Sequence, residues 1–255
     1  MRTRHALLLL ALVAPRTAPA QSAAPAPPAT RASDQVDDYH GRKVADPYRW
    51  LEDTDAPETA AWVNAQNAAT FAYLAAIPER EAIRKRLTQL WNYERYSTPF
   101  RRADRYFYFR NDGLQSQSVL YTQPSPGAPP AVLLDPNTMS ADGTVALSMT
   151  AVSHDGRYLA YGTSSSGSDW QEFRVRAVAD GSDLDDHLRW IKFSGASWTR
   201  DGKGFFYSRY PEPRDAALTE SNRNQTLYYH RIGTPQSQDV LAFAQADRPE
   251  RGVGA

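Results

Sequence analysis

The chain has 255 residues, of which 41% are hydrophobic and 23% charged, so it is long enough to bury one large core or two small ones. Its 29 basic and 29 acidic residues cancel, which argues against a nucleic acid or an anionic membrane surface as a partner. The absence of cysteine excludes disulfides, thiolate nucleophiles and cysteine-ligated metal sites.

The first twenty residues predict an export signal. Two arginines near the start precede an apolar run over residues 6–14, and small residues at 18–20 offer a cleavage site before Gln21. The apolar run is well short of the roughly 20 residues that a membrane-spanning helix needs. We therefore expect a signal peptide at residues 1–20 and a secreted or periplasmic mature protein with no membrane span.

Residues 21–33 consist mainly of Ala, Pro, Ser and Thr. They have little apolar surface to bury, so the entropy cost of ordering the backbone would go uncompensated. This composition predicts a disordered linker.

Residues 34–93 predict a helical arm. Asp55 is placed to cap a helix, with Pro57 in its first turn and Glu58 completing a capping box. The apolar spacing continues for about five turns until Pro78 stops the helix. A second helix should follow, because four apolar residues recur on one side of it: Ile83, Leu87, Leu90 and Trp91.

From residue 94 to residue 255 the pattern is that of β-structure. Short aromatic or β-branched runs alternate with clusters of Gly, Pro, Asp and Asn, which are typical of turns. The predicted strands are Arg105 to Arg110, Val119 to Thr122, Ala131 to Leu134, Ala146 to Val152, Tyr158 to Thr163, Glu172 to Val178, Gly204 to Tyr210, Thr226 to Arg231 and Val240 to Phe243.

An internal repeat indicates how these strands are organised. The turn at Asp155-Gly156 and the turn at Asp201-Gly202 lie 46 residues apart, and each joins a short strand to an aromatic one. This spacing matches the roughly 40 to 50 residues of a β-propeller blade. A weaker copy begins at Ala103. The sequence therefore predicts a mainly β fold: an incomplete propeller of about three blades after the helical arm.

Several segments, taken in order, resemble the prolyl oligopeptidase family of serine peptidases. The resemblance runs from about Asp34 to the C-terminus. Its most recognisable pieces are Asp38-Tyr39-His40-Gly41, the run from Asp46 to Asp53, Arg105-Tyr106-Phe107-Tyr108-Phe109, Gly113-Leu114-Gln115, the run from Asp142 to Leu147, and Ser166-Gly167-Ser168-Asp169-Trp170.

The resemblance implies a two-domain enzyme that cleaves short peptides after proline. An α/β-hydrolase domain would carry a Ser, Asp and His triad, and a seven-bladed propeller would cover it. We expect the helical arm, residues 34–93, to pack on the hydrolase domain in the family, and residues 94–255 to form part of the propeller. The hydrolase domain is absent from the sequence in hand, so we expect no catalytic residue in it and no peptidase activity from it alone. The implied partners are proline-containing peptides and a hydrolase domain or missing blades supplied in trans.

The resemblance points to one residue of the substrate cavity. An aromatic residue on a propeller strand reaches that cavity in the family, and by alignment it falls on Phe193. The alternative is ordinary packing of Phe193 between blades, because aromatic residues are common in both cores and binding pockets.

Other candidate residues do not form a convincing site. The segment from Gly162 to Gly167 resembles a nucleophile elbow but has one residue too many before the second glycine. His154 beside Asp155 falls in a predicted turn, and no two of the five histidines have the spacing of metal ligands. Adjacent acids such as Asp185 and Asp186 are typical of solvated turns. We expect no metal and no cofactor.

A second hypothesis belongs to a different class of protein. The chain could be a free-standing secreted module that offers propeller loops to peptides or glycans. A few blades cannot close a ring, so such a module would leave strand edges open to aggregation unless a partner covered them.

Overall fold

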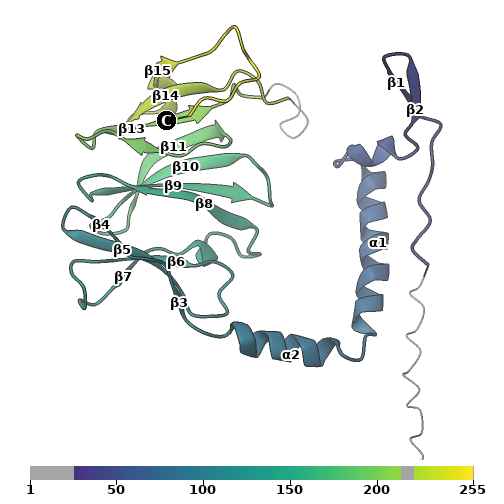
Figure 1. The fold of residues 1–255 in the computed structure, drawn as a ribbon, viewed down its shortest axis with the longest axis horizontal. Coiled ribbons are helices and arrows are strands. Elements are labelled where there is room, and N and C mark those ends of the chain that lie inside the picture. Colours follow the sequence, from purple (N-terminus) through teal and green to yellow (C-terminus); the bar gives the residue numbers. More distant parts are fainter. Residues whose placement is uncertain (1–25, 214–220, 255) are drawn as a thin grey trace, which may run out of the picture. The chain divides into compact units, whose positions relative to one another are not determined.

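The computed structural model of the chain describes residues 26–213 and 221–254, so the predicted signal peptide lies outside the described residues. The chain divides into two compact units, Met1–Arg86 and Leu87–Ala255. Figure 1 shows the two long helices before β3 and strands from β3 onward.

The first unit contains a hairpin and the helical arm. Strand β1 (Val36–Tyr39) pairs with β2 (Arg42–Ala45), and a short 3-10 helix η1 follows at Arg49–Glu52. Helix α1 covers Pro57–Ala75, and α2 (Arg80–Trp91) continues past the boundary between the units. Among the described residues, no helix combines the length and the apolar character that crossing a membrane requires.

The start of α1 differs from the prediction. The cap position is Ala56, and no side chain caps the helix there. Asp55 lies one residue too early, and its backbone N–H donates to the Asp53 carboxylate over 3.2 Å. Pro57 occupies the first turn, where a missing N–H costs nothing. The capping box that we expected at Asp55 is therefore wrong.

Part of the segment predicted as a disordered linker, residues 21–33, contacts α1. The indole Nε1 of Trp62 donates to Thr30 Oγ1 over 2.9 Å, and Gln66 Nε2 donates to the Pro28 carbonyl over 3.0 Å. These contacts use hydroxyl and carbonyl oxygens rather than apolar surface, so a composition analysis based on hydrophobicity does not anticipate them.

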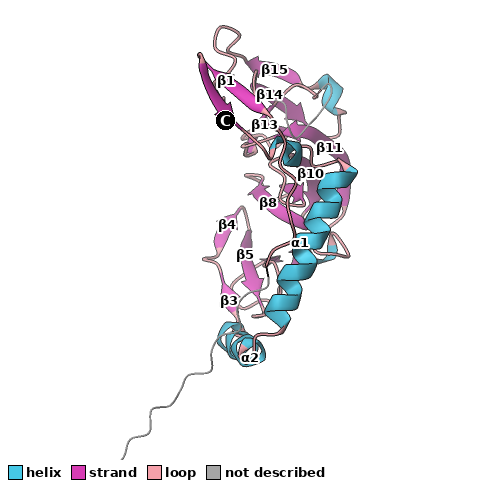
Figure 2. Ribbon diagram, turned by 90° about the vertical axis from the view of Figure 1, so that its right-hand side faces the viewer, coloured by secondary structure: helices cyan, strands magenta, loops and turns pink. Residues whose placement is uncertain are grey.

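The second unit holds three antiparallel sheets that follow one another along the chain (Figures 1 and 2). Every strand predicted from the sequence is a strand in the structure. The first sheet contains β3 (Arg95–Tyr96), β4 (Phe100–Arg102), β5 (Arg105–Asn111), β6 (Val119–Gln123) and β7 (Ala131–Leu134); the second contains β8 (Val145–Val152), β9 (Tyr158–Ser165), β10 (Gln171–Ala177) and β11 (Asp183–Ile191); the third contains β12 (Ser197–Trp198), β13 (Gly204–Arg209), β14 (Thr226–Arg231) and β15 (Val240–Phe243).

Strand β11 is the main element that the sequence analysis missed. Its nine residues include Asp185 and Asp186, for which the sequence pattern predicts a solvated turn. Asp186 is instead buried, and its carboxylate accepts a hydrogen bond from His230 in the third sheet. The turn interpretation is wrong because a buried cationic partner compensates the charge of this carboxylate.

The three sheets stack through apolar and aromatic side chains. One buried cluster joins the first and second sheets around Phe107, and another joins the second and third around Phe173 and Phe205. A hydrogen bond crosses the second junction, where Trp198 Nε1 donates to the Ala151 carbonyl over 2.9 Å. This packing confirms the fold class: three blades of an incomplete β-propeller preceded by two helices.

Candidate functional site

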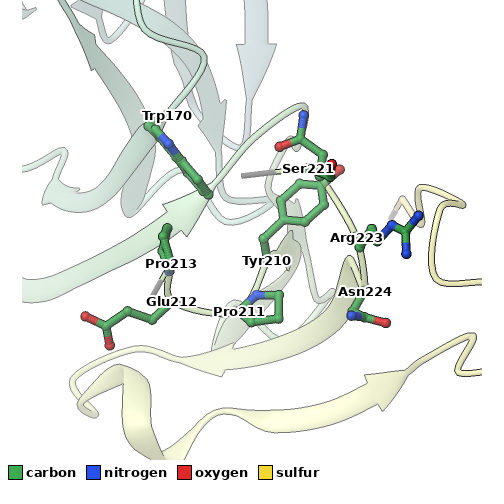
Figure 3. Close-up of a pocket in the computed structure, with 9 residues that line it drawn as sticks. Trp170, Tyr210, Pro211, Glu212, Pro213, Ser221, Arg223 and Asn224 are labelled. Carbon is green, nitrogen blue, oxygen red and sulfur yellow. The ribbon is translucent and has the colours of Figure 1, made fainter. Parts of the chain in front are cut away.

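A cavity of about 260 Å³ lies at one end of the second and third sheets. It is formed by the residue before β10, the segment after β13 and the segment before β14, and Figure 3 shows the side chains around it. The described residues that line it are Trp170, Tyr210, Pro211, Glu212, Pro213, Ser221, Asn222, Arg223 and Asn224. Aromatic and proline rings with a few polar groups are typical of a ligand pocket.

Two aromatic rings, those of Trp170 and Tyr210, form an aromatic wall of this pocket, and Trp190 packs against Trp170. Trp170 meets Trp190 edge to face at 5.7 Å between ring centroids, and it meets Tyr210 edge to face at 6.3 Å. The backbone N–H of Tyr210 donates to the Trp190 carbonyl over 2.9 Å, which ties the end of β13 to β11. Burial raises the pKa of the Tyr210 phenol, so Tyr210 is a neutral hydrogen-bonding group at physiological pH.

Lys192 supplies a buried cation behind the aromatic wall. Its Nζ lies 4.0 Å from the centroid of the Trp170 ring and donates to Asn222 Oδ1 over 2.9 Å. The residue is only 7% exposed, so the ring face and the amide replace part of its hydration. The Lys192 carbonyl accepts a hydrogen bond from Gln225 Nε2. The side chain and the backbone carbonyl of Lys192 are therefore both held by hydrogen bonds to residues of the segment before β14, Asn222 and Gln225.

Phe193, the residue that the resemblance singled out, follows Lys192 directly and has two unusual properties. It is 65% exposed, and its φ is +54°, in the left-handed region. A bulky residue there is strained, and such strain is found mostly at functional positions. Ser194 anchors the same loop, because its Oγ accepts a hydrogen bond from the Ser208 backbone N–H over 2.8 Å. Among the described residues, the exposed ring of Phe193 does not pack between two blades.

The other residues considered in the sequence do not come together. His154 lies in the turn before β9, whereas Ser166 lies in the turn after it. A strand rises about 3.3 Å per residue, so the eight residues of β9 separate the two turns by about 26 Å. An imidazole and a hydroxyl at that distance cannot form a catalytic pair.

Sequence reasoning missed the pocket itself. Trp170 was noted only as part of the resemblance, and Tyr210 and Lys192 were not singled out. They come from three different strand ends, and only the propeller packing brings them together. The one available signal was Trp170, an aromatic residue directly after a polar turn, where turn residues alone would be expected.

Comparison with known proteins identifies relatives of the chain. Residues 27–255 match the model described as prolyl oligopeptidase, N-terminal beta-propeller domain. The chain is 41% identical over 229 residues to a prolyl endopeptidase of Elizabethkingia meningoseptica, and 38% identical over 259 residues to prolyl oligopeptidase A of Amanita bisporigera; each match covers 89% of this chain.

Solved structures agree with the sequence matches. A structure from a study of two prolyl endopeptidases superimposes with a TM-score of 0.80 at 39% identity, covering 86% of this chain and 32% of that one. Prolyl oligopeptidase B from Galerina marginata, bound to a 35-residue hydrolysis and macrocyclization substrate, superimposes with a TM-score of 0.75 at 34% identity, covering 88% of this chain and 34% of that one. The chain spans about a third of the length of the relatives that it matches.

Proposed function

Because this chain belongs to the prolyl oligopeptidase family, we propose that it is the propeller portion of a serine peptidase that cleaves short peptides after proline. In this proposal, Phe193 and the pocket around Trp170 form part of the propeller surface that contacts the peptide. The observation that carries the proposal is Phe193, an exposed ring on strained backbone directly after Lys192, whose ammonium group contacts Trp170 of the pocket.

The chemistry of such an enzyme needs groups that the described residues, 26–213 and 221–254, do not bring together. A serine hydroxyl must lie within hydrogen-bonding reach of a histidine that is itself oriented by a carboxylate, with hydrogen-bond donors for the oxyanion. The family match covers the propeller domain only. The proposed role of this part is to bind the peptide, restrict access to short chains and help exclude water from a hydrolase domain.

Peptide binding by the chain tests the proposal. A fluorescently labelled, proline-containing peptide should bind the purified chain, and Phe193→Ala should weaken binding about tenfold. Phe71→Ala is the matched control, because Phe71 is 63% exposed and lies on α1, outside the pocket. Equal affinity for the wild type and both variants would contradict the proposed binding surface.

Peptidase activity is tested separately. The purified chain should not hydrolyse a proline-containing fluorogenic peptide, whereas a fusion to the remaining two thirds of the Elizabethkingia meningoseptica relative should do so. Inhibitor-sensitive turnover by the unfused chain would show that residues 1–255 hold a catalytic centre of their own.

Export is proposed from the N-terminal pattern alone. The basic start, apolar run and small residues at 18–20 support a signal peptide. Expression in a host with a Sec pathway, followed by N-terminal sequencing of the exported product, should give a mature chain that starts at Gln21. A product that stays in the cytoplasm and retains its N-terminal residues would contradict export.

A further inference from the structure

His230 lies buried at the junction between the second and third sheets, between two carboxylates. It stands on β14, and its side chain is 0% exposed. Nε2 lies 2.8 Å from Oδ1 of Asp186, which belongs to β11 of the second sheet. Nδ1 lies 2.7 Å from Oδ1 of Asp239, just before β15 of the third sheet. The imidazole therefore joins β14 and the residue before β15 in the third sheet to β11 in the second sheet.

This geometry requires a charged imidazole. Ionised carboxylate oxygens only accept hydrogen bonds, so both ring nitrogens of His230 must donate, and only the imidazolium has two N–H groups. Burial by itself would lower the pKa of His230, but the hydrogen bonds to Asp186 and Asp239 outweigh it and raise the pKa to about 9.

The other described groups that contact the carboxylates of Asp186 and Asp239 are neutral, so they do not replace the positive charge of His230. Tyr207 Oη donates to Asp239 Oδ2 over 2.5 Å, and the Gly233 backbone N–H donates to Asp186 Oδ1 over 2.8 Å. Oδ2 of Asp186 is buried and has no hydrogen-bond partner among the described residues. The ring of Phe205 packs on the imidazole at 5.4 Å. A neutral His230 would leave two buried carboxylates without a cation, which is strongly unfavourable.

The junction between the first and second sheets provides an internal comparison. Arg176 on β10 pairs with Leu159 of β9, as His230 on β14 pairs with Phe205 of β13. Leu159 and Phe205 each lie four residues after the aspartate of the repeated Asp-Gly turn, so Arg176 and His230 hold equivalent positions.

Arg176 makes the same two kinds of contact as His230. It donates to the Asp183 carboxylate in its own blade over 2.7 and 2.9 Å, and it donates to the Leu133 carbonyl of the preceding blade over 2.9 Å. Its guanidinium does not lose its proton at any pH that the fold survives. The first junction therefore has a permanent cation, and the second has one that titrates.

We propose that His230 acts as a pH-sensitive latch between the second and third blades. The latch is closed while the imidazole is protonated and binds Asp186 and Asp239. Alkaline pH opens it and loosens this junction, whereas the junction held by Arg176 stays closed. The inference rests on the contacts of His230 and Arg176 and does not depend on peptidase function.

Two measurements on the full chain test the latch. In the first, the histidine ring carbons are labelled with ¹³C and followed by NMR from pH 5 to pH 10, with His230→Gln used for assignment. His230 should remain protonated at pH 8, where a free imidazole with a pKa of about 6.5 is neutral. A neutral His230 at or below pH 7 would overturn the proposal, whether or not the variant folds.

The second measurement follows the junctions themselves. The chain has no native cysteine, so spin labels at Asp185→Cys and Arg231→Cys report the distance across the second junction. Labels at Val132→Cys and Ala179→Cys report the first junction. All four positions are exposed. Between pH 7 and pH 10 the distance distribution should broaden only for the labels at positions 185 and 231, which span the second junction. His230→Lys should reduce this broadening. Equal behaviour of both pairs would overturn the latch.

Discussion

A Cβ atom added to Gly202 would lie 2.6 Å from Oδ2 of Asp155, which stands in the equivalent Asp-Gly turn of the preceding blade. Gly156 meets the turn before it in the same way, because its added Cβ would lie 3.2 Å from the Arg102 carbonyl. The glycine of the repeat therefore has two functions. It supplies the left-handed turn, and it lets consecutive blades approach each other.

The first prediction separates these two functions of glycine. Gly202→Ala should destabilise the chain by about 1–2 kcal/mol for the left-handed conformation, with about 1–3 kcal/mol more for overpacking against Asp155. Gly181→Ala is the control, because Gly181 also has a positive φ, of +73°, but has nothing within 4 Å of an added Cβ. Urea unfolding measures both. Equal losses for the two variants would show that the contact with Asp155 carries no energy.

The second prediction concerns the pH dependence of stability. The folded-state pKa of His230, about 9, lies above the ordinary value of 6.5. The stabilisation that His230 contributes is therefore fully present below pH 6.5 and is lost as the pH rises through 9. We expect the free energy of unfolding to fall by on the order of 2–3 kcal/mol over this range. His230→Gln should flatten this slope, and an unchanged slope in that variant would contradict the assignment.

The third prediction tests the hydrogen bond between β12 of the third sheet and β8 of the second. Trp198→Phe keeps an aromatic ring in the second junction but removes the donor to the Ala151 carbonyl, leaving that oxygen without this partner. The free energy of unfolding should fall by about 1–3 kcal/mol, as measured by chemical denaturation. Trp62→Phe, which removes the bond to Thr30 in the first unit, is a comparison for a less buried indole.

The strands were predictable from sequence where local patterns decide them. Strands β7 and β14 have the bounds that their β-branched and aromatic runs indicate. Strand β11 was missed because its acidic residues resemble a solvated turn. The burial of Asp186 depends on His230, which lies 44 residues away and is brought close only by blade packing. Local sequence patterns carry no information about such a contact.

Local sequence patterns are equally uninformative about the candidate site. Phe193 came from a resemblance and not from its own pattern, and its strained backbone could not be read from the sequence. Trp170 and Lys192 stack at 4.0 Å although 22 positions separate them in the chain. Sites assembled from the ends of several strands need the topology first, because each strand contributes only one or two residues.

The last prediction asks whether Phe193 serves binding at the expense of stability. Its side chain is 65% exposed and its φ is +54°, so its removal costs little packing while the strained backbone remains. Phe193→Gly relieves that strain and should stabilise the chain by about 1 kcal/mol relative to Phe193→Ala. Both variants should lose peptide affinity to the same extent, because both lack the ring. A glycine variant less stable than the alanine variant would show that the left-handed backbone at Phe193 is not strained, and Phe193 would then lose its main claim to a functional role.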